Sequence, residues 1–531
     1  MNKRYLILKN TILTLLLGLM FFGGCKKEET LPEAPRLFRP VISGEILGSG
    51  NWLSAQWTKV KDAASYTAEI SRDSFRTVIK SVTADTNLVT FDNLEWLALY
   101  QIHVRANAAA ESKNSGFSFL GERKTEKFPS IMATPTSQEI LDKAVLLRWT
   151  NKGDAVTNMK VTLKTGGTLV KDVVLNASDI ASQYKVISGL LPQVSYTVTL
   201  YSGTTIRGYE TFTTVAQIIN GTNIVDLSQD SNADVFTSAY LSSLTNGALV
   251  ILKRGMTYNI GAVNIDKSVS FVSEVTFFGT PAKLNLVGNF NIAASSNISE
   301  ISFKTVDLIG AALDGYASRY VFNINVVSTI AKITFDDCKI KALRGVLRTQ
   351  AGPQINTVSF NKCLIDSIAG YGVVTCDNTA STVQNVILTN STISDAQKVL
   401  TSKSNATSVL IENCTFYLAP QNPNYFLDYG ALAVTGGITI KNSIFGAGKP
   451  SAATPPVLTV GGFRPATINI TSAGNFKTSD LVWTLATDLP GLADYAGASS
   501  ALFKSPATDD FTIIDTKFAG KSTAGDPRWR P

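Results

Sequence analysis

Charged side chains recur at matched positions in the second half of this chain. Apolar residues spaced 27, 26 and 27 positions apart predict one stacked column, made of Leu347, Val374, Leu400 and Leu427. Residues one or three positions later then lie on neighbouring turns and form a lateral strip of Arg348, Asp377, Lys403 and Asp428. An arginine or lysine can act as a base or neutralise a carboxylate, and aspartates can ligate calcium. The sequence therefore predicts a candidate site on this strip.

The composition of the strip leaves both catalysis and simple salt bridging open. A calcium-dependent site gathers several acids, whereas these acids are sparse and alternate with cations. Salt bridges on a solvated face are the alternative, and they favour a non-catalytic role. No cofactor is then required, although Asp377 and Asp428 stay the candidate calcium ligands. The sequence contains no GxSxG, P-loop or HExxH motif, which disfavours serine-hydrolase, nucleotide and zinc-protease chemistry.

Residues 416–429 form the most aromatic loop of this region. Tyr417, Tyr425 and Tyr429 each combine an apolar ring face with a hydroxyl, which is the pairing that sugar rings require. The alternative is that the phenylalanines of the loop are core residues, which the tyrosines merely cover. If a glycan binds, we expect these tyrosines beside the charged strip.

A repeated segment predicts the elements that position the strip. Short apolar segments recur at intervals of 32, 25, 28, 23 and 29 residues, from residues 301–303 to residues 438–440. Self-similarity at this period is typical of stacked coils, in which each strand pairs in parallel with the coils above and below. Asn390, Asn413 and Asn442 end successive segments and are expected to form a side-chain ladder.

The cysteines follow the same repeat. Cys338, Cys363 and Cys414 fall at matching positions, Cys376 does not, and no two cysteines form a CxxC pair. Matching positions favour small apolar core residues over zinc ligands. A disulfide is the alternative, because an exported protein can be oxidised.

The first half contains two copies of one strand pattern. Trp57 and Trp149 mark an early strand of each copy, and a leucine precedes a tyrosine by six residues in both. These pairs are Leu94 with Tyr100 and Leu190 with Tyr196. The order resembles fibronectin type III domains, in which large rings fill the space between two sheets. We expect the two domains to be spacers, and the single histidine, His103, has no histidine partner for a metal site.

These patterns predict an all-β chain, with two fibronectin type III-like β-sandwiches followed by a right-handed parallel β-helix. Residues 249–272, with Gly255 and Tyr258, resemble the first coils of pectin-lyase-like β-helices. The expected segments are a signal peptide at 1–25, a tether at 26–38, sandwiches at 39–127 and 128–215, and the β-helix with its C-terminal cap at 216–531. The domain order and the closing segment 511–529 resemble uncharacterised Bacteroidetes-type surface lipoproteins.

The N-terminus predicts a lipid anchor. Lys3 and Arg4 precede an apolar run that ends at Phe22 and is too short to span a bilayer. The residues up to Cys25 resemble a bacterial lipobox, which implies lipidation of Cys25. Residues 26–29 resemble the export signal of Bacteroidetes-type lipoproteins. The resemblance implies attachment to outer-membrane lipid with the protein facing the cell exterior, and the periplasm is the alternative.

The resemblance in fold implies carbohydrate chemistry. Polysaccharide lyases of the pectin-lyase type remove a proton beside a uronate with an arginine or lysine, while calcium neutralises the carboxylate. That mechanism would use Arg348 or Lys403 with Asp377 and Asp428. Because the acids are sparse, we favour a non-catalytic protein that binds extracellular polysaccharide within a glycan-acquisition system, with a polysaccharide lyase as the alternative. A net charge of +7 without a basic stripe disfavours nucleic acid as a partner.

Overall fold

The computed structural model describes residues 36–311, 318–464, 469–484 and 489–531. The predicted signal peptide, Cys25 and most of the tether lie outside these residues. Within the described part of the chain, no helix is long and apolar enough to cross a membrane.

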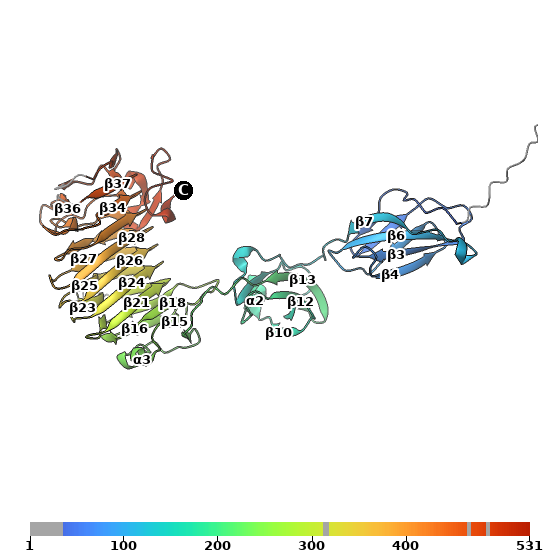
Figure 1. The fold of residues 1–531 in the computed structure, drawn as a ribbon, viewed down its shortest axis with the longest axis horizontal. Coiled ribbons are helices and arrows are strands. Elements are labelled where there is room, and N and C mark those ends of the chain that lie inside the picture. The colour runs from blue at the N-terminus through green and yellow to red at the C-terminus, as the bar shows by residue number, and fades with distance from the viewer. Residues whose placement is uncertain (1–35, 312–317, 465–468, 485–488) are drawn as a thin grey trace, which may run out of the picture. The chain divides into compact units, whose positions relative to one another are not determined.

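The first sandwich consists of two antiparallel sheets (Figure 1). One sheet has the order β1 (Leu47–Ser49), β2 (Trp52–Gln56) and β5 (Leu88–Phe91), and the other β4 (Lys80–Ala84), β3 (Ser65–Ser71), β6 (Leu99–Asn107) and β7 (Ser118–Lys124). Trp57 is fully buried between them, with its ring centroid 5.2 Å from that of Tyr66. The Tyr100 hydroxyl accepts a hydrogen bond from the backbone N–H of Glu95, a contact typical of such sandwiches. His103 lies between the rings of Phe75 and Phe117 and contacts Glu69.

The second sandwich repeats this arrangement. Its larger sheet has the order β10 (Leu169–Val174), β9 (Asn158–Leu163), β12 (Ser195–Ser202) and β13 (Thr205–Thr213), and its smaller sheet pairs β11 (Tyr184–Ser188) with β8 (Ala144–Arg148). Helix α2 (Ala177–Ser182) precedes β11. Trp149 and Tyr196 are 3% and 1% exposed, so both predicted rings are core residues.

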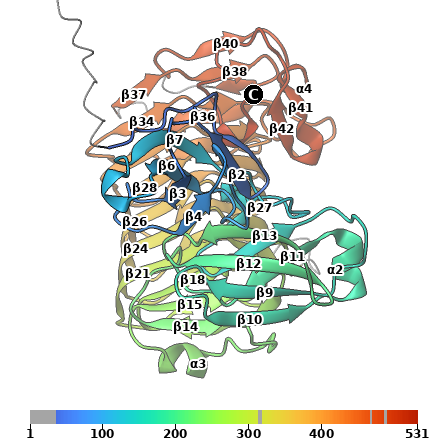
Figure 2. The ribbon, with the colours of Figure 1, turned by 90° about the vertical axis from the view of Figure 1, so that its right-hand side faces the viewer.

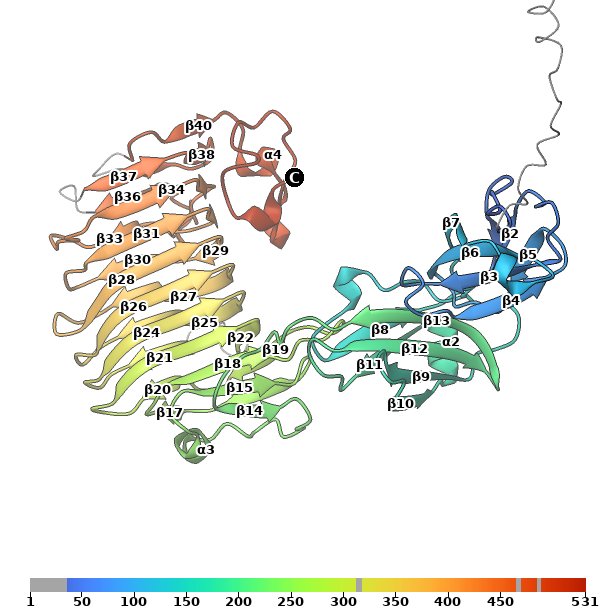
Figure 3. The same cartoon turned by 45° about the vertical axis from the view of Figure 1, so that its right-hand side comes forward.

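Parallel strands from Ile224 onward stack into a β-helix (Figure 3). Sheet G, on one face, contains β14 (Ile224–Leu227), β15 (Ala248–Leu252), β18 (Val269–Ser273), β21 (Asn297–Lys304), β24 (Thr329–Asp336), β26 (Gln354–Asn361), β28 (Thr382–Thr389), β31 (Ser408–Glu412), β34 (Ile438–Lys441) and β37 (Ile470–Ala473). Helix α3 (Ser238–Ser243) lies near its start. The predicted fold class is therefore confirmed.

Two further ladders of parallel strands complete each coil. The first ladder contains β16 (Thr257–Ile260), β19 (Ala282–Leu286), β22 (Val306–Gly310), β29 (Thr392–Ala396), β32 (Thr415–Tyr417), β35 (Ile444–Phe445), β38 (Phe476–Thr478) and β40 (Ala493–Tyr495). The second ladder contains β17 (Val263–Ile265), β20 (Phe290–Ile292), β23 (Tyr320–Ile324), β30 (Leu400–Ser402), β33 (Tyr425–Asp428), β36 (Val460–Arg464) and β39 (Trp483–Thr484). The long strands β25 (Lys339–Thr349) and β27 (Leu364–Cys376) run through both ladders.

The interior of the coils is a stack of aromatic and aliphatic side chains. Phe271, Phe303, Phe335 and Phe360 pair in register, and their successive ring centroids are 5.3, 5.3 and 4.8 Å apart. All four rings are fully buried. Cys338, Cys363 and Cys414 are buried free thiols, so the predicted core role holds and the disulfide alternative does not. Burial raises the pKa of Cys414 to about 12.

Each strand of sheet G from β21 onward ends at a left-handed corner. The next residue has φ between 50° and 67° in every case, and these corner residues are Thr305, Asp337, Lys362, Asn390, Asn413, Asn442 and Gly474. Glycine, asparagine and aspartate adopt this conformation most readily. Asn413 Nδ2 also donates to Asn390 Oδ1 over 3.2 Å, so part of the predicted ladder forms. The left-handed backbone conformation shared by these corners explains why asparagine recurs at this position of the repeat.

Lys362 is a poor residue for such a corner. We expect Lys362→Asn to raise the free energy of unfolding of the β-helix by about 1 kcal/mol, because asparagine tolerates the left-handed conformation that lysine resists. Urea unfolding monitored by circular dichroism would measure the change. Lys332→Asn, within the regular strand β24, is the control and should give no gain. An equal gain in both variants, or none in Lys362→Asn, would contradict the explanation.

A C-terminal cap packs beside the last coils. It contains α4 (Ser499–Leu502), β41 (Phe503–Ser505) and β42 (Asp510–Ile513), and Figure 2 shows these elements next to β38 and β40. The final residues run back along the coils: the Asp526 carboxylate accepts a hydrogen bond from Thr392 over 2.9 Å, and Trp529 donates to the Thr392 hydroxyl over 2.8 Å. Arg530 reaches Asn413. This C-terminal clamp fastens the cap to β29 and to a corner residue.

Candidate functional site

The register of the second ladder aligns the predicted apolar column. Leu347 pairs with Val374, Val374 with Leu400, and Leu400 with Leu427. All four side chains are at most 2% exposed, so the column faces the core. One position later the strands form a second row of Asn323, Arg348, Thr375, Thr401, Asp428 and Arg464. This row adds a cation, Arg464, to the predicted strip.

Asp377 holds two cations of the strip. Its carboxylate lies 2.9 Å from Nε of Arg348 and 2.8 Å from Nζ of Lys403. Asp377 and Arg348 are each 17% exposed, whereas Lys403 is 59% exposed. Burial acts to raise the pKa of Asp377, but hydrogen bonds from Lys403 and Arg348 outweigh it and hold this pKa below its ordinary value. The carboxylate therefore stays ionised between the two cations.

Arg348 is held as a cation by the same contact. Burial is the largest single effect and acts to lower the pKa of the guanidinium, but the hydrogen bond to Asp377 and the electrostatic interactions with Tyr371, Asp377 and Tyr320 together outweigh it, so the pKa lies above its ordinary value. A general base needs the opposite shift, because it must lose its proton near neutral pH. The geometry therefore suits Arg348 to bind an anion rather than to remove a proton.

Asp428 pairs with Arg464 and not with Lys403. Nε of Arg464 donates to Oδ1 of Asp428 over 2.8 Å, and Nη2 donates to Oδ2 over 2.9 Å. This bidentate pair is geometrically specific. The hydrogen bond from Asp428 is the largest cause that raises the pKa of Arg464. Arg464 is 45% exposed, so its outer edge faces solvent.

The two candidate calcium ligands each have cation partners instead of a shared ion site. Asp377 contacts Arg348 and Lys403, and Asp428 contacts Arg464. Among the residues that the structure describes, no group of three or more histidine, cysteine, aspartate or glutamate side chains could hold a metal ion. The strip is thus a row of salt bridges, which is the geometry of the salt-bridging alternative to catalysis that the sequence left open.

Two tyrosine rings lie against the arginines of the strip. The guanidinium carbon of Arg348 is 3.7 Å from the ring centroid of Tyr371, and that of Arg464 is 4.5 Å from the ring centroid of Tyr425. Arg344 approaches the Tyr371 ring to 4.9 Å. Such contacts are cation–π interactions, which order both partners. Tyrosine, arginine and aspartate thus occur together twice along the second ladder.

Glycines on neighbouring strands make room for these rings. A Cβ atom on Gly345 would lie 2.8 Å from the side chain of Tyr371, and one on Gly461 would lie 2.5 Å from the ring of Tyr425. Cβ atoms do not approach side chains so closely, so a larger residue would displace either ring. The absence of a side chain at Gly345 and Gly461 therefore leaves the space that the two tyrosines occupy.

The sequence reasoning missed Tyr371 and Arg464. Tyr371 belongs to a bulge, since one residue of β25 between two aligned pairs faces three residues of β27. The signal was present: Ile340 and Ile365 are 25 residues apart, whereas Leu347 and Val374 are 27 apart. The sequence reasoning missed Arg464 because a long insertion, residues 446–459, lies between β35 and β36 of its own coil and lengthens the spacing from Asp428.

The other two predicted tyrosines do not join the strip. Tyr429 is 1% exposed, and burial raises its pKa, so its ring is a core residue that cannot face a ligand. Tyr417 packs against Phe511 of the C-terminal cap, with ring centroids 5.6 Å apart. Of the three predicted tyrosines, Tyr425 is the one that contacts a strip arginine.

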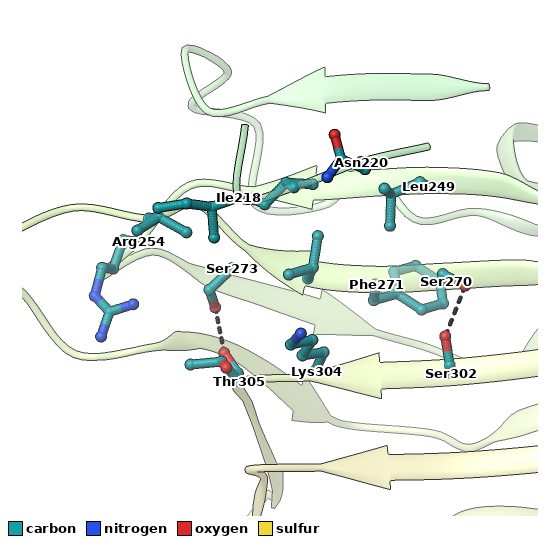
Figure 4. Close-up of a pocket in the computed structure, with 13 residues that line it drawn as sticks. Ile218, Asn220, Leu249, Arg254, Ser270, Phe271, Ser273, Ser302, Lys304 and Thr305 are labelled. Atoms are coloured by element: carbon teal, nitrogen blue, oxygen red, sulfur yellow. Dashed lines mark hydrogen bonds between the residues drawn. The ribbon is translucent and has the colours of Figure 1, made fainter. Parts of the chain in front are cut away.

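A separate cavity of about 330 Å³ lies on the outward side of sheet G (Figure 4). Leu249 and Val272 form its apolar wall, and residues 218–220 border it. Ser302 donates to Ser270 over 2.6 Å at one end, and Lys304 lines it as well. Its lining contains no acid and no residue of the strip. It therefore offers no acid–base pair for catalysis.

Comparisons with known proteins match parts of the chain. The family described as Domain of unknown function (DUF4957) matches residues 256–396, and Domain of unknown function (DUF5123) matches residues 409–529. No curated protein matches the sequence. A two-domain fibronectin type III segment of chicken tenascin aligns at 17% identity and a TM-score of 0.16, over 33% of this chain and 97% of that one. The FN1–FN3 domains of chicken CNTN1 align at 14% identity and a TM-score of 0.15, over 35% and 69%.

Proposed function

We propose that this protein binds an extended extracellular polysaccharide along the strip on the second ladder. In this proposal it is a lipoprotein, attached through Cys25 to the outer membrane and facing the cell exterior, where it serves a glycan-acquisition system. The β-helix match to two domains of unknown function is compatible with this role and does not assign it. The proposal therefore depends on the side chains of the strip.

The observation that carries the proposal is the pair of arginine-contacted tyrosines, Tyr371 and Tyr425. A face of a tyrosine ring that no arginine covers can meet the C–H face of a sugar, and the hydroxyl can hydrogen-bond. The adjacent Arg348 and Arg464 supply several N–H donors for hydroxyl, carboxylate or sulfate oxygens. The two rings belong to strands of one continuous ladder, β27 and β33, which supports a ligand that extends over several coils.

The polysaccharide lyase alternative is less well supported. Proton abstraction next to a uronate requires a base whose pKa is lowered towards neutrality. The pKa of Arg348 is raised, and the aspartates that would hold calcium accept hydrogen bonds or ion pairs from cations. These contacts favour a binding site.

Removal of one ring tests the proposed site. We expect Tyr425→Ala to weaken retardation of the full chain, solubilised in detergent, in polysaccharide-containing gels by about tenfold, because it removes the aromatic face. The control is Tyr201→Ala in the second sandwich, where Lys160 lies 5.4 Å from the ring. Unchanged binding in Tyr425→Ala and Tyr371→Ala would sink the proposal. Unsaturated product that absorbs ultraviolet light, and that is lost in Arg348→Ala, would replace it with a lyase.

A further inference from the structure

Charge alternates from coil to coil along the strip. Arg348 on β25 is followed by Asp377 at the end of β27, Lys403 at the end of β30, Asp428 on β33 and Arg464 on β36. These five strands pair consecutively in register. For these five side chains the order is therefore cation, carboxylate, cation, carboxylate, cation, each from one of five successive coils.

This order gives the strip a fixed charge period. Parallel strands lie about 4.8 Å apart, so cations on every second strand recur at about 10 Å along the axis of the β-helix. Lys403 lies two residues further along its coil than the row that contains Arg348 and Arg464. That distance is close to the length of two linked sugar rings in an extended chain. A ligand lying along the coils would therefore meet one cation for every two sugar residues.

The cations keep donors for such a ligand. Lys403 and Arg464 are 59% and 45% exposed, and Arg348 uses Nε and one terminal nitrogen for Asp377. A guanidinium has five N–H donors, so neither arginine uses all of its donors on aspartate, although Arg348 is only 17% exposed. Arg344 beside Tyr371 adds a further cation, and the described strip is therefore net positive.

The carboxylates between the cations disfavour polymers with a different spacing of negative charges. A polymer with a negative group on every sugar would bring charges next to Asp377 and Asp428, and like-charge contacts disfavour a wrong partner. A neutral polymer would leave the cations without an anionic partner beyond these two aspartates. Both arguments favour a polymer that carries a negative group on about every second sugar.

We infer that the ligand is an anionic polysaccharide whose negative groups recur at about every second sugar residue. This inference rests on the proposed function, since it assumes that a glycan lies along the strip. It goes further by naming the charge and the charge spacing of that glycan. Carboxylate and sulfate share this chemistry.

A panel of polymers tests the charge period. The probes are hyaluronan, with one carboxylate per disaccharide, two polymers with a negative group on every sugar, namely chondroitin sulfate and polygalacturonate, and a neutral β-glucan. We expect hyaluronan to bind the full chain at least about tenfold more tightly than polygalacturonate or chondroitin sulfate, and the binding to weaken with added salt. Polygalacturonate, chondroitin sulfate or a DNA duplex binding as tightly as hyaluronan would overturn the inference.

Variants separate this inference from the proposed function. Lys403→Ala should weaken binding of the preferred polymer about tenfold, whereas the control Lys504→Ala, which removes a lysine of 63% exposure paired with Asp510, should not. Asp428→Asn should raise polygalacturonate affinity several-fold. Tight, salt-insensitive binding of β-glucan that needs Tyr425 would overturn the inference and leave the proposed function standing. Binding to none of the glycans would sink both.

Discussion

Phe335→Ala is expected to destabilise the β-helix by about 3–5 kcal/mol, the usual cost of removing a fully buried phenylalanine. The Phe335 ring is 0% exposed and lies between those of Phe303 and Phe360, at centroid distances of 5.3 and 4.8 Å. Each coil holds the next in register through this stack, so a cavity there removes contacts on both sides. Chemical unfolding followed by tryptophan fluorescence and circular dichroism would measure the loss.

Phe119→Ala provides the matched control. The ring of Phe119 is 59% exposed on β7 of the first sandwich, so the same substitution creates no cavity. We expect a change within about 0.5 kcal/mol for this variant. A loss below about 1 kcal/mol in Phe335→Ala would show that the aromatic stack does not support the coils.

Asp526→Ala is expected to cost about 2–4 kcal/mol by releasing the C-terminal clamp. The Asp526 side chain is 2% exposed and accepts hydrogen bonds from the Thr392 hydroxyl, the backbone N–H of Arg528 and the Arg528 guanidinium. Burial raises the pKa of this carboxylate, and Arg528 opposes the shift. Alanine would leave the buried Thr392 hydroxyl without this acceptor and would remove both hydrogen bonds that Arg528 donates to Asp526.

Limited proteolysis gives a local readout of the clamp. We expect the cap of Asp526→Ala to be cleaved faster than that of the wild-type chain, while the sandwiches keep their cleavage rate. Asp494→Ala is the control, because Asp494 is 76% exposed and its pair with Lys477 is solvated. Equal cleavage of the cap in both variants would rule out a clamp at Asp526.

The repeating part of the fold was predictable because its signal is periodic. The asparagine corners, the apolar strand segments and the column from Leu347 to Leu427 each follow from similar residues that recur once in every coil. Because the coils stack in register, residues one coil apart in the sequence lie next to each other in the structure. The sandwich cores were predictable for the same reason, since Trp57 and Tyr100 occupy positions that alternate with exposed residues.

The rest of the site depended on breaks in that period. Tyr371 enters the strip through a bulge, and Arg464 through a coil lengthened by an insertion, so counting from the previous coil misses both. Tyr429 looked available, yet its ring turns into the core. The clamp joins Thr392 to Asp526 across 134 residues, a separation at which no local pattern predicts contact.

Because the left-handed corners are equivalent, a whole coil can be removed or added between two of them. From β21 onward each coil leaves sheet G through the same backbone conformation, although the coils differ in length from 23 to 32 residues. Excision of residues 363–390 would join Lys362 to Ser391 across equivalent corners and bring Arg348 next to Lys403 without Asp377 between them. Loss or duplication of a single coil is therefore a direct evolutionary route to a new ligand. It changes the order of charges along the strip, while the apolar interior of the β-helix stays continuous.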